Sequence, residues 1–465
     1  MRIHRLSSED AAILALESPT VAGHTCKVVL LDPPPAGAAP LTVAALRARV
    51  AAGLEAAAQL RRRVVETPLG LARPAWVDDG DFDLARHVRR AATSSAPLDE
   101  ERLRALCARA MEERLDRAHP LWTIDVVEPD QAGRAALIWK LHHALADGTE
   151  ALRLADAILW DETAPPAQAR AGAGPEPEPR APALVAAALR ERAGDAAGGA
   201  AALARGALSP SAWRAAAVEA RRLPGAVVRD LLPERPPSPL DAPAGVRREV
   251  AFAAVALDDL KRIEHGEPER TTVNDVLLAL VAGALRRWVA GHGGAPHELR
   301  VKVPVSLHDR HAHPDAVANR DSFLCVGLPL AEDDPGARLR AIAADTRRRK
   351  REHDPETLDV LFRTLRRGPR PVARLASRLA ATPRTFALEV SNLPGPAEPR
   401  HVLGHPAAAL RSLAEIGERH ALRITAVSLA GTVHVGLTAD AAAVEDVGAL
   451  AAGMEAEAAD LLSRT

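Results

Sequence analysis

Apolar positions along the chain fall either into short runs of strand length or into longer repeats of helical spacing. The short runs predict strands at 27–31, 135–141, 301–305, 323–328, 388–390, 423–429 and 432–437. The repeats of helical spacing predict helices at 41–54, 101–115, 273–288, 336–351 and 443–462. Because strands and helices follow each other in an irregular order, the pattern predicts an α/β fold with mixed sheets.

One segment rich in proline, alanine and arginine interrupts this pattern. Residues 161–245 contain 13 of the 37 prolines of the chain, a composition typical of a linker with marginal helices. The linker separates an N-terminal half (1–160) from a C-terminal half (246–465). A second interpretation is that its stretches 184–189 with Arg190 and Arg192, and 213–223, contact a lipid surface through apolar residues interspersed with arginine.

Composition and charge narrow the class of protein. A hydrophobic fraction of 47% and a charged fraction of 26% are typical of a soluble globular protein, and a net charge of −1 gives no basic field for nucleic acid. Three separate cysteines without a CxxC pair fit a reducing cytosol. We expect a cytoplasmic location, because the N-terminal segment lacks the apolar core of a signal peptide and no apolar run approaches the ~20 residues of a spanning helix.

The densest group of chemically capable side chains is His142-His143-Ala144-Leu145-Ala146-Asp147-Gly148, between a predicted strand and a following helical pattern. Neighbouring strand residues point to opposite faces, so only one of His142 and His143 can enter a given cavity. Asp147 stands where a carboxylate caps a helix, and Gly148 suits a tight backbone. A purely structural role and a general base both remain open. A metal site is disfavoured, because a second histidine one helical turn away is missing.

These seven positions match the HHxxxDG motif, and here the chain resembles the wax ester synthase/diacylglycerol acyltransferase family. The resemblance extends along nearly the whole chain in the same order, apart from the 161–245 linker. Further matching blocks are 6–10 with His24, 74–79, 82–84, 87–89, Pro120-Leu121-Trp122, Asn274-Asp275, 303–306, 391–396 and 431–440.

The resemblance implies two chloramphenicol-acetyltransferase-like domains with an active-site tunnel between them and His143 near its middle. His143 would act as the general base, and His142 would contribute more through packing. Asp147 would brace the loop by pairing with an arginine, for which Arg61 and Arg63 are candidates. The residues expected to form tunnel wall and helix packing are Pro120, Leu121, Trp122, Asn274 and Asp275. No bound cofactor or metal is implied, because acyl-CoA is a co-substrate.

The expected partners are acyl-CoA and a lipid alcohol or diacylglycerol, with contact at the inner membrane or at lipid bodies. Departures from the family pattern bear on the acceptor. They are Thr123 for an acidic residue, Asp241 for Asn, Arg423 for Asn and Leu429 for Tyr. Arg423 would place charge beside a pocket. Two alternatives are therefore open: a transferase of the same fold that acts on a secondary-metabolite alcohol or amine, and a non-catalytic lipid-binding paralogue.

Overall fold

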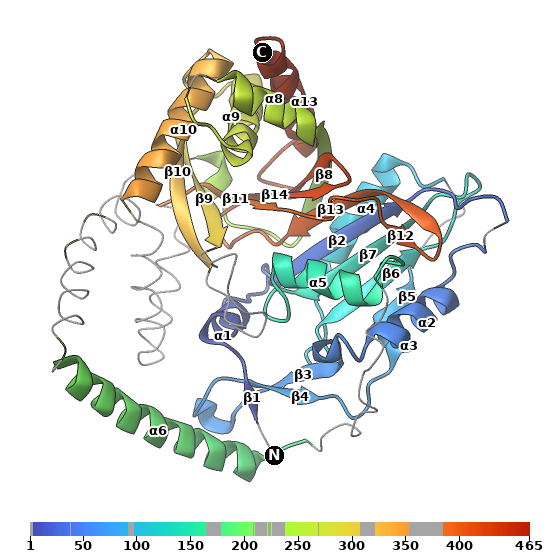
Figure 1. The fold of residues 1–465 in the computed structure, drawn as a ribbon, viewed down its shortest axis with the longest axis vertical. Coiled ribbons are helices and arrows are strands. Elements are labelled where there is room, and N and C mark those ends of the chain that lie inside the picture. Colours follow the sequence, from blue (N-terminus) through green and yellow to red (C-terminus); the bar gives the residue numbers. More distant parts are fainter. Residues whose placement is uncertain are drawn as a thin grey trace.

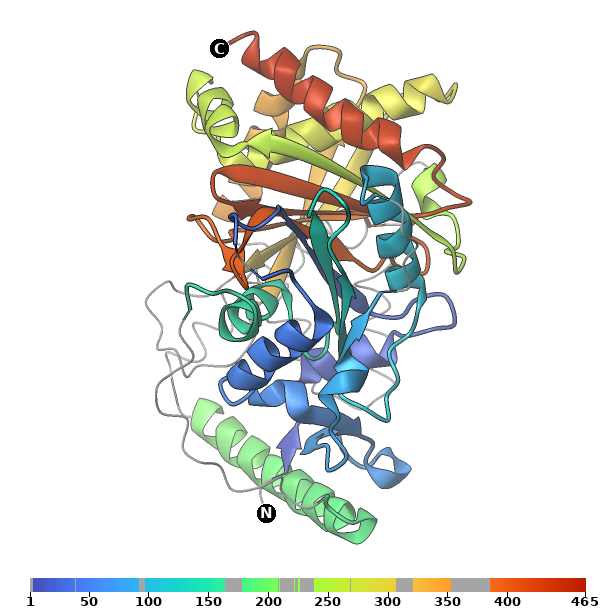
Figure 2. The same cartoon turned by 90° about the vertical axis from the view of Figure 1, so that its right-hand side faces the viewer.

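The computed structural model contains two six-stranded sheets and one three-stranded sheet within the residues that it describes. Those residues are 3–37, 39–91, 97–163, 178–207, 209, 221, 225, 238–267, 269–306, 321–352 and 385–465. The C-terminal helices lie at the top of Figure 1, the N-terminal sheet lies in the middle, and the small sheet lies at the bottom. Figure 2 shows the same order from the side.

The N-terminal six-stranded sheet carries the HHxxxDG segment at the end of a central strand. Its order is β12 (His401–Val402), β13 (His405–Ala414), β2 (His24–Leu31), β7 (Ala135–His142), β6 (Trp122–Val127) and β5 (Val88–Arg90). Only β5 and β6 pair in parallel. Because side chains alternate along a strand, one face packs on α4 (Glu100–Glu112), and the other packs on α2 (Val43–Gly53) and α5 (Gly148–Ile158).

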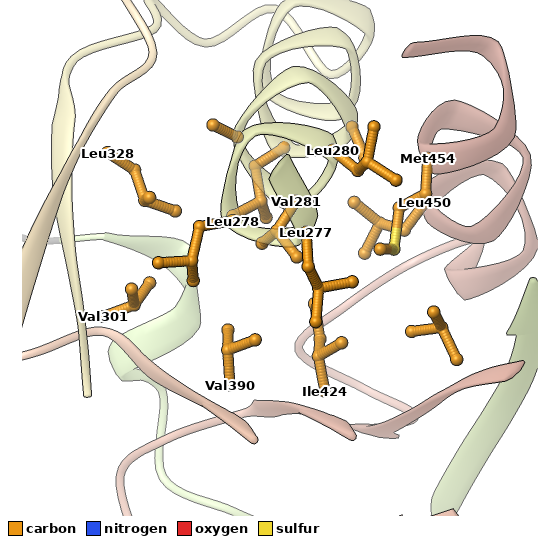
Figure 3. Close-up of a cluster of buried hydrophobic side chains, with 14 of the residues drawn as sticks. Leu277, Leu278, Leu280, Val281, Val301, Leu328, Val390, Ile424, Leu450 and Met454 are labelled. Atoms are coloured by element: carbon orange, nitrogen blue, oxygen red, sulfur yellow. The ribbon is translucent and has the colours of Figure 1, made fainter. Parts of the chain in front are cut away.

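The C-terminal six-stranded sheet carries the largest apolar core. Its order is β10 (Asp321–Pro329), β9 (Glu298–Ser306), β11 (Leu388–Leu393), β14 (Leu422–Leu429), β15 (Thr432–Asp440) and β8 (Arg248–Ala256). The helices that contribute to this core are α8 (Leu257–Gly266), α9 (Val273–Gly291), α10 (Pro335–Arg351) and α13 (Val447–Leu462). Figure 3 shows leucines of α9 packed between the strands and α13. The central turns of α9 are apolar on every side, as expected of a helix that is buried all round.

The small sheet has the order β1 (His4–Arg5), β4 (Ala75–Asp78) and β3 (Arg62–Val65). The short helices of the N-terminal half are α1 (Ser8–Ala15), α3 (Leu84–His87), η1 (Ala58–Arg61) and η2 (Pro68–Gly70), and η3 (Pro239–Asp241) follows the linker.

The first part of the linker forms a helix, α6 (Ala181–Ala207), at the lower edge of the molecule in Figure 1. Leu184 and Ala188 are buried, and Glu191 pairs with Arg5 of β1 at 3.1 Å. One side of the 184–189 stretch therefore packs on the protein itself. The other stretch, 213–223, lies outside the described residues except for residue 221.

The predicted mixed α/β architecture is confirmed, with one difference in how the sheets follow the chain. Strands β12 and β13 belong to the C-terminal half, but β13 pairs with β2 and extends the N-terminal sheet. This pairing covers an edge of β2 that would otherwise expose unpaired backbone groups. A division at 160 and 246 therefore describes the order of the chain but not the membership of the two sheets.

Candidate active site

His142 is the last residue of β7, and contacts at both ring nitrogens hold it. Its Nδ1 accepts a hydrogen bond from Ala144 N at 3.0 Å, so the neutral ring carries its proton on Nε2. That Nε2 lies 2.9 Å from Glu17 Oε1. His24 pairs with His142 in register and packs against it edge-on. The ring is 1% exposed and lies on the α4 face of the sheet, like Ile138 four residues earlier.

Glu17 is a member of this site that the sequence analysis did not single out. It lies just beyond α1 and also pairs with Arg114 at 2.6 Å and with Arg117 at 2.8 Å. Burial favours a raised pKa for Glu17, but the contacts with His142 and Arg117 outweigh it and lower the pKa to about 2. Glu17 is therefore a carboxylate at neutral pH and compensates both arginines.

Gly23 allows the backbone to pass close to the histidine pair. Its φ is +68°, and a Cβ at this position would lie 2.8 Å from His142 Nε2. Its carbonyl oxygen accepts a hydrogen bond from the backbone N of His143 at 2.9 Å. Both the left-handed backbone and the close approach require glycine here.

His143 follows directly after β7 and has different surroundings. It is half-buried, and its Nδ1 is buried without a hydrogen bond to any other described residue, whereas contact with the backbone of His143 itself slightly opposes the lowering of the ring's pKa. Burial of the ring, followed by the positive charge of Arg423, lowers the pKa of His143 to about 4, although Asp147 and Glu389 oppose the shift. The ring is therefore neutral at pH 7, which is the state that a general base requires.

Asp147 is the N-cap of α5, where its Oδ1 accepts a hydrogen bond from Glu150 N at 2.7 Å. The predicted ion pair with Arg61 or Arg63 is wrong for the part of the chain that the structure describes. Arg63 pairs with Glu178 at 2.6 Å, and no arginine of the described ranges pairs with Asp147. The physical reason is the cap geometry, which directs the carboxylate to the free N–H groups at the start of the helix.

Gly148 is the first residue of α5, and its φ is not positive. The tight backbone expected from the sequence is therefore not the reason for glycine here. A Cβ at Gly148 would lie 2.4 Å from Leu393 Cδ1 of β11. The close approach of the Leu393 side chain from the C-terminal sheet therefore favours glycine at the start of α5.

The Pro120-Leu121-Trp122 segment holds the end of β7 in place through a backbone hydrogen bond. The carbonyl oxygen of Leu121 accepts a hydrogen bond from His142 N at 2.9 Å, and that of Pro120 accepts one from Trp122 N at 2.9 Å. Trp122 Nε1 donates to Leu60 O at 2.7 Å, and the indole stacks on His87. The segment thus positions the histidine pair through the backbone of β7.

Asn274 and Asp275 lie in the first turn of α9, and Asn274 is half-buried. The Asp275 carboxylate closes a capping box with Thr272, whose Oγ1 donates to it at 2.7 Å. This arrangement supports the expected role in helix packing. A role of these two residues in a tunnel wall stays a prediction.

Three charged side chains cross the C-terminal sheet in one row. Lys302 of β9 is in register with Glu389 of β11, which is in register with Arg423 of β14. Arg423 Nη2 donates to Glu389 Oε1 at 2.6 Å, and Lys302 Nζ donates to Glu389 Oε2 at 3.3 Å. Burial favours a raised pKa for Glu389, but the charges of Arg423 and Lys302 lower it to about 2. Glu389 is therefore ionised and shared by two cations.

The row lies on the face of the C-terminal sheet that meets the N-terminal sheet. The alternating neighbours Leu388, Val390 and Ile424 belong to the C-terminal core, so the charged side chains point the other way. Leu393 and Leu429, on the same face as the row, pack in the N-terminal core. We call the contact between the two sheets the seam.

Lys27 of β2 lies on the face of the N-terminal sheet that also carries Val29 and Leu31, which pack with α2 and α5. It is 2% exposed, and its Nζ donates to Ser412 Oγ of β13 at 2.6 Å. Burial lowers the pKa of Lys27 to about 8, with opposing effects from Cys26 and Asp147 and a further lowering by Arg423. Lys27, Asp147, Arg423 and His143 thus form one electrostatic group at the seam.

Two cavities of about 250 and 170 Å³ lie along α4 and the strands β5 and β6, and His143 lines neither of them. The tunnel through His143 stays a prediction. Within the described ranges, no group of three or more His, Cys, Asp or Glu side chains is placed to hold a metal. In the same residues, no helix has both the length and the apolar character needed to cross a bilayer.

The arrangement of two mixed sheets around a seam matches solved structures along the whole chain. The wax ester synthase/diacylglycerol acyltransferase from Marinobacter aquaeolei VT8 superposes with a TM-score of 0.69 at 22% identity, covering 98% of both chains. The first condensation domain of the calcium-dependent antibiotic synthetase superposes with a TM-score of 0.60 at 16% identity, covering 99% of this chain and 96% of the other. The expected chloramphenicol-acetyltransferase-like fold class is thereby confirmed.

The family is established by sequence. Residues 6–277 match the model of the wax ester synthase/diacylglycerol acyltransferase catalytic domain, and residues 317–461 match that of the WS/DGAT C-terminal domain. A relative from Mycobacterium tuberculosis H37Rv, the "Probable diacyglycerol O-acyltransferase tgs2", is 32% identical over 97% of both chains. A second from the same organism, the "Probable diacyglycerol O-acyltransferase tgs1", is 30% identical over 85% of this chain and 83% of its own. The chain belongs to the wax ester synthase/diacylglycerol acyltransferase family and is an acyltransferase.

Proposed function

We propose that the protein transfers a fatty acyl group from acyl-CoA to the hydroxyl of an acceptor, with His143 as the general base. The observation that carries this proposal is the state of the His143 ring, which is neutral at pH 7 and whose Nδ1 has no partner from another described residue. The family membership gives the class of reaction. The names of the mycobacterial relatives favour diacylglycerol as an acceptor, and the name of the family, wax ester synthase/diacylglycerol acyltransferase, adds alcohols that form wax esters.

The proposed reaction needs only one proton shuttle. His143 takes the proton of the acceptor hydroxyl while the oxygen attacks the thioester carbonyl carbon. The tetrahedral oxyanion that forms is stabilised by nearby positive charge and hydrogen-bond donors, and its collapse breaks the carbon–sulfur bond. The imidazolium then returns its proton to the CoA thiolate. The ester leaves without a covalent enzyme intermediate.

The experiment uses the purified full-length protein with palmitoyl-CoA and, in turn, diacylglycerol, hexadecanol and hexadecylamine. We expect release of CoA thiol that depends on the acceptor and equals the ester formed. The control is His143→Gln, which keeps a polar side chain of similar size. Thiol release that needs neither an acceptor nor His143 would refute acyl transfer. Release that depends on His143 but occurs with hexadecylamine alone, and with neither hydroxyl acceptor, would favour the amine-directed alternative.

We also propose that the lower edge of the molecule contacts lipid, because the product of acyl transfer is insoluble in water. Leu69 in η2 is 92% exposed and Leu189 in α6 is 55% exposed, and α6 packs against η2. The exposed Arg190 and Arg192 lie beside Leu189 and suit anionic headgroups. Exposed leucines with nearby arginines on two neighbouring elements are the pattern of an interfacial contact.

Vesicle flotation with anionic liposomes tests this contact. We expect the intact protein to float and the double variant Leu69→Ser/Leu189→Ser to float much less. A chain lacking residues 165–235 gives the corresponding result for the whole linker. Equal flotation of all three proteins, or none by the intact protein, would contradict the contact.

A further inference from the structure

The part of the seam beside His143 has an apolar side and a charged side. Leu393 meets the start of α5 at Gly148, and Val427 and Leu429 of β14 pack in the N-terminal core. Further toward the other end of the same strands, the same face carries Glu389 and Arg423. The first group is apolar and compatible with hydrocarbon, whereas the second group is unsuited to it.

The charged side has more positive than negative groups. The groups that act on the pKa values of Lys27, His143 and Glu389 in this part of the seam include the cations Lys27, Lys302 and Arg423 and the carboxylates Glu389 and Asp147. Glu389 is shared by Lys302 and Arg423, and one oxygen of Asp147 is used by the cap of α5. One positive charge is therefore left over.

Most of this excess positive charge lies on Lys27. It is 2% exposed, its Nζ has Ser412 Oγ as a partner, and no carboxylate of the described residues lies within ion-pair distance of it. A buried cation without a counter-ion is unfavourable, and an anion bound beside it would compensate its charge. Two of its three N–H groups have no acceptor among the described residues.

Arg423 has a second free donor. Its Nη2 donates to Glu389 and its Nη1 to the backbone oxygen of Glu415 at 3.3 Å, but its Nε is buried without an acceptor in the described part of the chain. Neither a long-chain alcohol nor diacylglycerol brings a charged oxygen to this position. A carboxylate or a phosphate matches both the charge and the donors of Lys27 and Arg423.

We propose that Lys27, Lys302 and Arg423 form a subsite beside His143 for an anionic oxygen group, and that the preferred acceptor carries a carboxylate or phosphate close to its hydroxyl. This inference rests on the proposed acyl transfer at His143. The same chemistry could be met by a phosphate of CoA, so the experiment separates the two sources. Arg423 and Lys27 are specificity-determining residues in this arrangement.

The test compares acceptors that differ only in charge. With palmitoyl-CoA as donor, 3-hydroxyhexadecanoate is compared with its methyl ester, and 1-palmitoylglycerol 3-phosphate with 1-palmitoylglycerol. We expect kcat/KM for the anionic member of at least one pair to exceed that of its neutral partner about tenfold or more. The loss of one charge-assisted hydrogen bond corresponds to about 10- to 100-fold, so Arg423→Asn should remove most of this preference, measured as the ratio of kcat/KM for the anionic and the neutral member of a pair.

Two further variants complete the design. Lys27→Met tests the subsite if Arg423→Asn fails to fold, and it should remove the same preference. Arg411→Asn is the matched control, because Arg411 of β13 pairs with Glu100 of α4 on the other side of the N-terminal sheet. It should leave the preference unchanged.

The outcomes are distinct. If the cations bind CoA instead, Arg423→Asn lowers the rate for every acceptor with palmitoyl-CoA but not with palmitoyl-N-acetylcysteamine, which supports the anion subsite and assigns it to the donor. A wild-type enzyme that uses both members of each pair equally, and whose Arg423→Asn variant shows no loss that depends on CoA, would overturn the subsite. So would an equal loss with all acceptors and both thioesters. Failure to transfer to any acceptor would instead refute the proposed function.

Discussion

His142 and His143 are neighbours in the chain, yet they lie in opposite kinds of surroundings. The His142 ring has Ala144 N at one nitrogen and Glu17 at the other, and Glu17 compensates two arginines. The His143 ring lies at a seam with excess positive charge and has a buried nitrogen without a described partner. The difference shows that a histidine held against a counter-charge stabilises a fold, whereas a neutral histidine beside excess positive charge at a seam is a candidate for chemistry.

The largest expected effect separates the two rings by activity. His143→Ala should lower kcat by roughly 10²–10⁴, the usual contribution of a positioned general base. Its melting temperature should stay close to that of the wild type, because the ring makes no described hydrogen bond at Nδ1. Steady-state kinetics and thermal unfolding of the same samples check both points. Equal losses of kcat in folded His143→Ala and His142→Ala proteins would show that the assignment of roles is wrong.

The second effect concerns stability. His142→Ala should lower the free energy of unfolding by about 1–3 kcal/mol, because it leaves buried polar groups without a partner. Glu17 would keep its two arginines, so the loss should stay within this range. Denaturant unfolding monitored by tryptophan fluorescence measures it. A destabilisation that is absent in His142→Ala but present in His143→Ala would reverse the comparison.

The third effect is the pH dependence of kcat/KM. A pKa of about 4 for His143 keeps the base neutral, so activity should be level from pH 8 to about pH 5 and fall below that as the ring takes up a proton. Arg423→Asn removes a positive charge, raises this pKa and moves the acid limb to higher pH. The unfolded chain has the higher pKa, so the stability contributed by neutral His143 is present above pH 6.5 and is lost as the pH falls toward 4. An acid limb near pH 6.5 in the wild type would contradict this assignment.

The smallest effect concerns Asp147. Since it caps α5, Asp147→Ala should cost about 1 kcal/mol of stability, and Asp147→Asn only a few tenths, because asparagine also caps helices well. Thermal unfolding of the two variants distinguishes the cap from a buried ion pair. A loss of ~3–5 kcal/mol in Asp147→Asn would instead indicate a broken buried pair.

Local patterns in the sequence determined much of the architecture. The apolar run 135–141 lies in β7 (Ala135–His142), and the repeat 273–288 lies in α9 (Val273–Gly291). Burial of a strand or a helix imposes a characteristic spacing of apolar residues, and this spacing is visible in the sequence without knowledge of the tertiary contacts. Strand β13 was not predicted. Its sequence HPAAALRSLA has few β-branched or aromatic residues, and its pairing with β2 comes from tertiary contacts.

The candidate site shows the same division between local and tertiary information. The motif and the strand-to-helix corner placed His142, His143, Asp147 and Gly148 together from the sequence alone, because they are adjacent in the chain. The partner of Asp147, the reason for Gly148 and the charges around His143 depend on β11 and β14, more than 200 residues away. Only the packing of one sheet against the other decides such contacts. The local spacing of apolar and polar residues carries no information on which distant side chains meet across the seam.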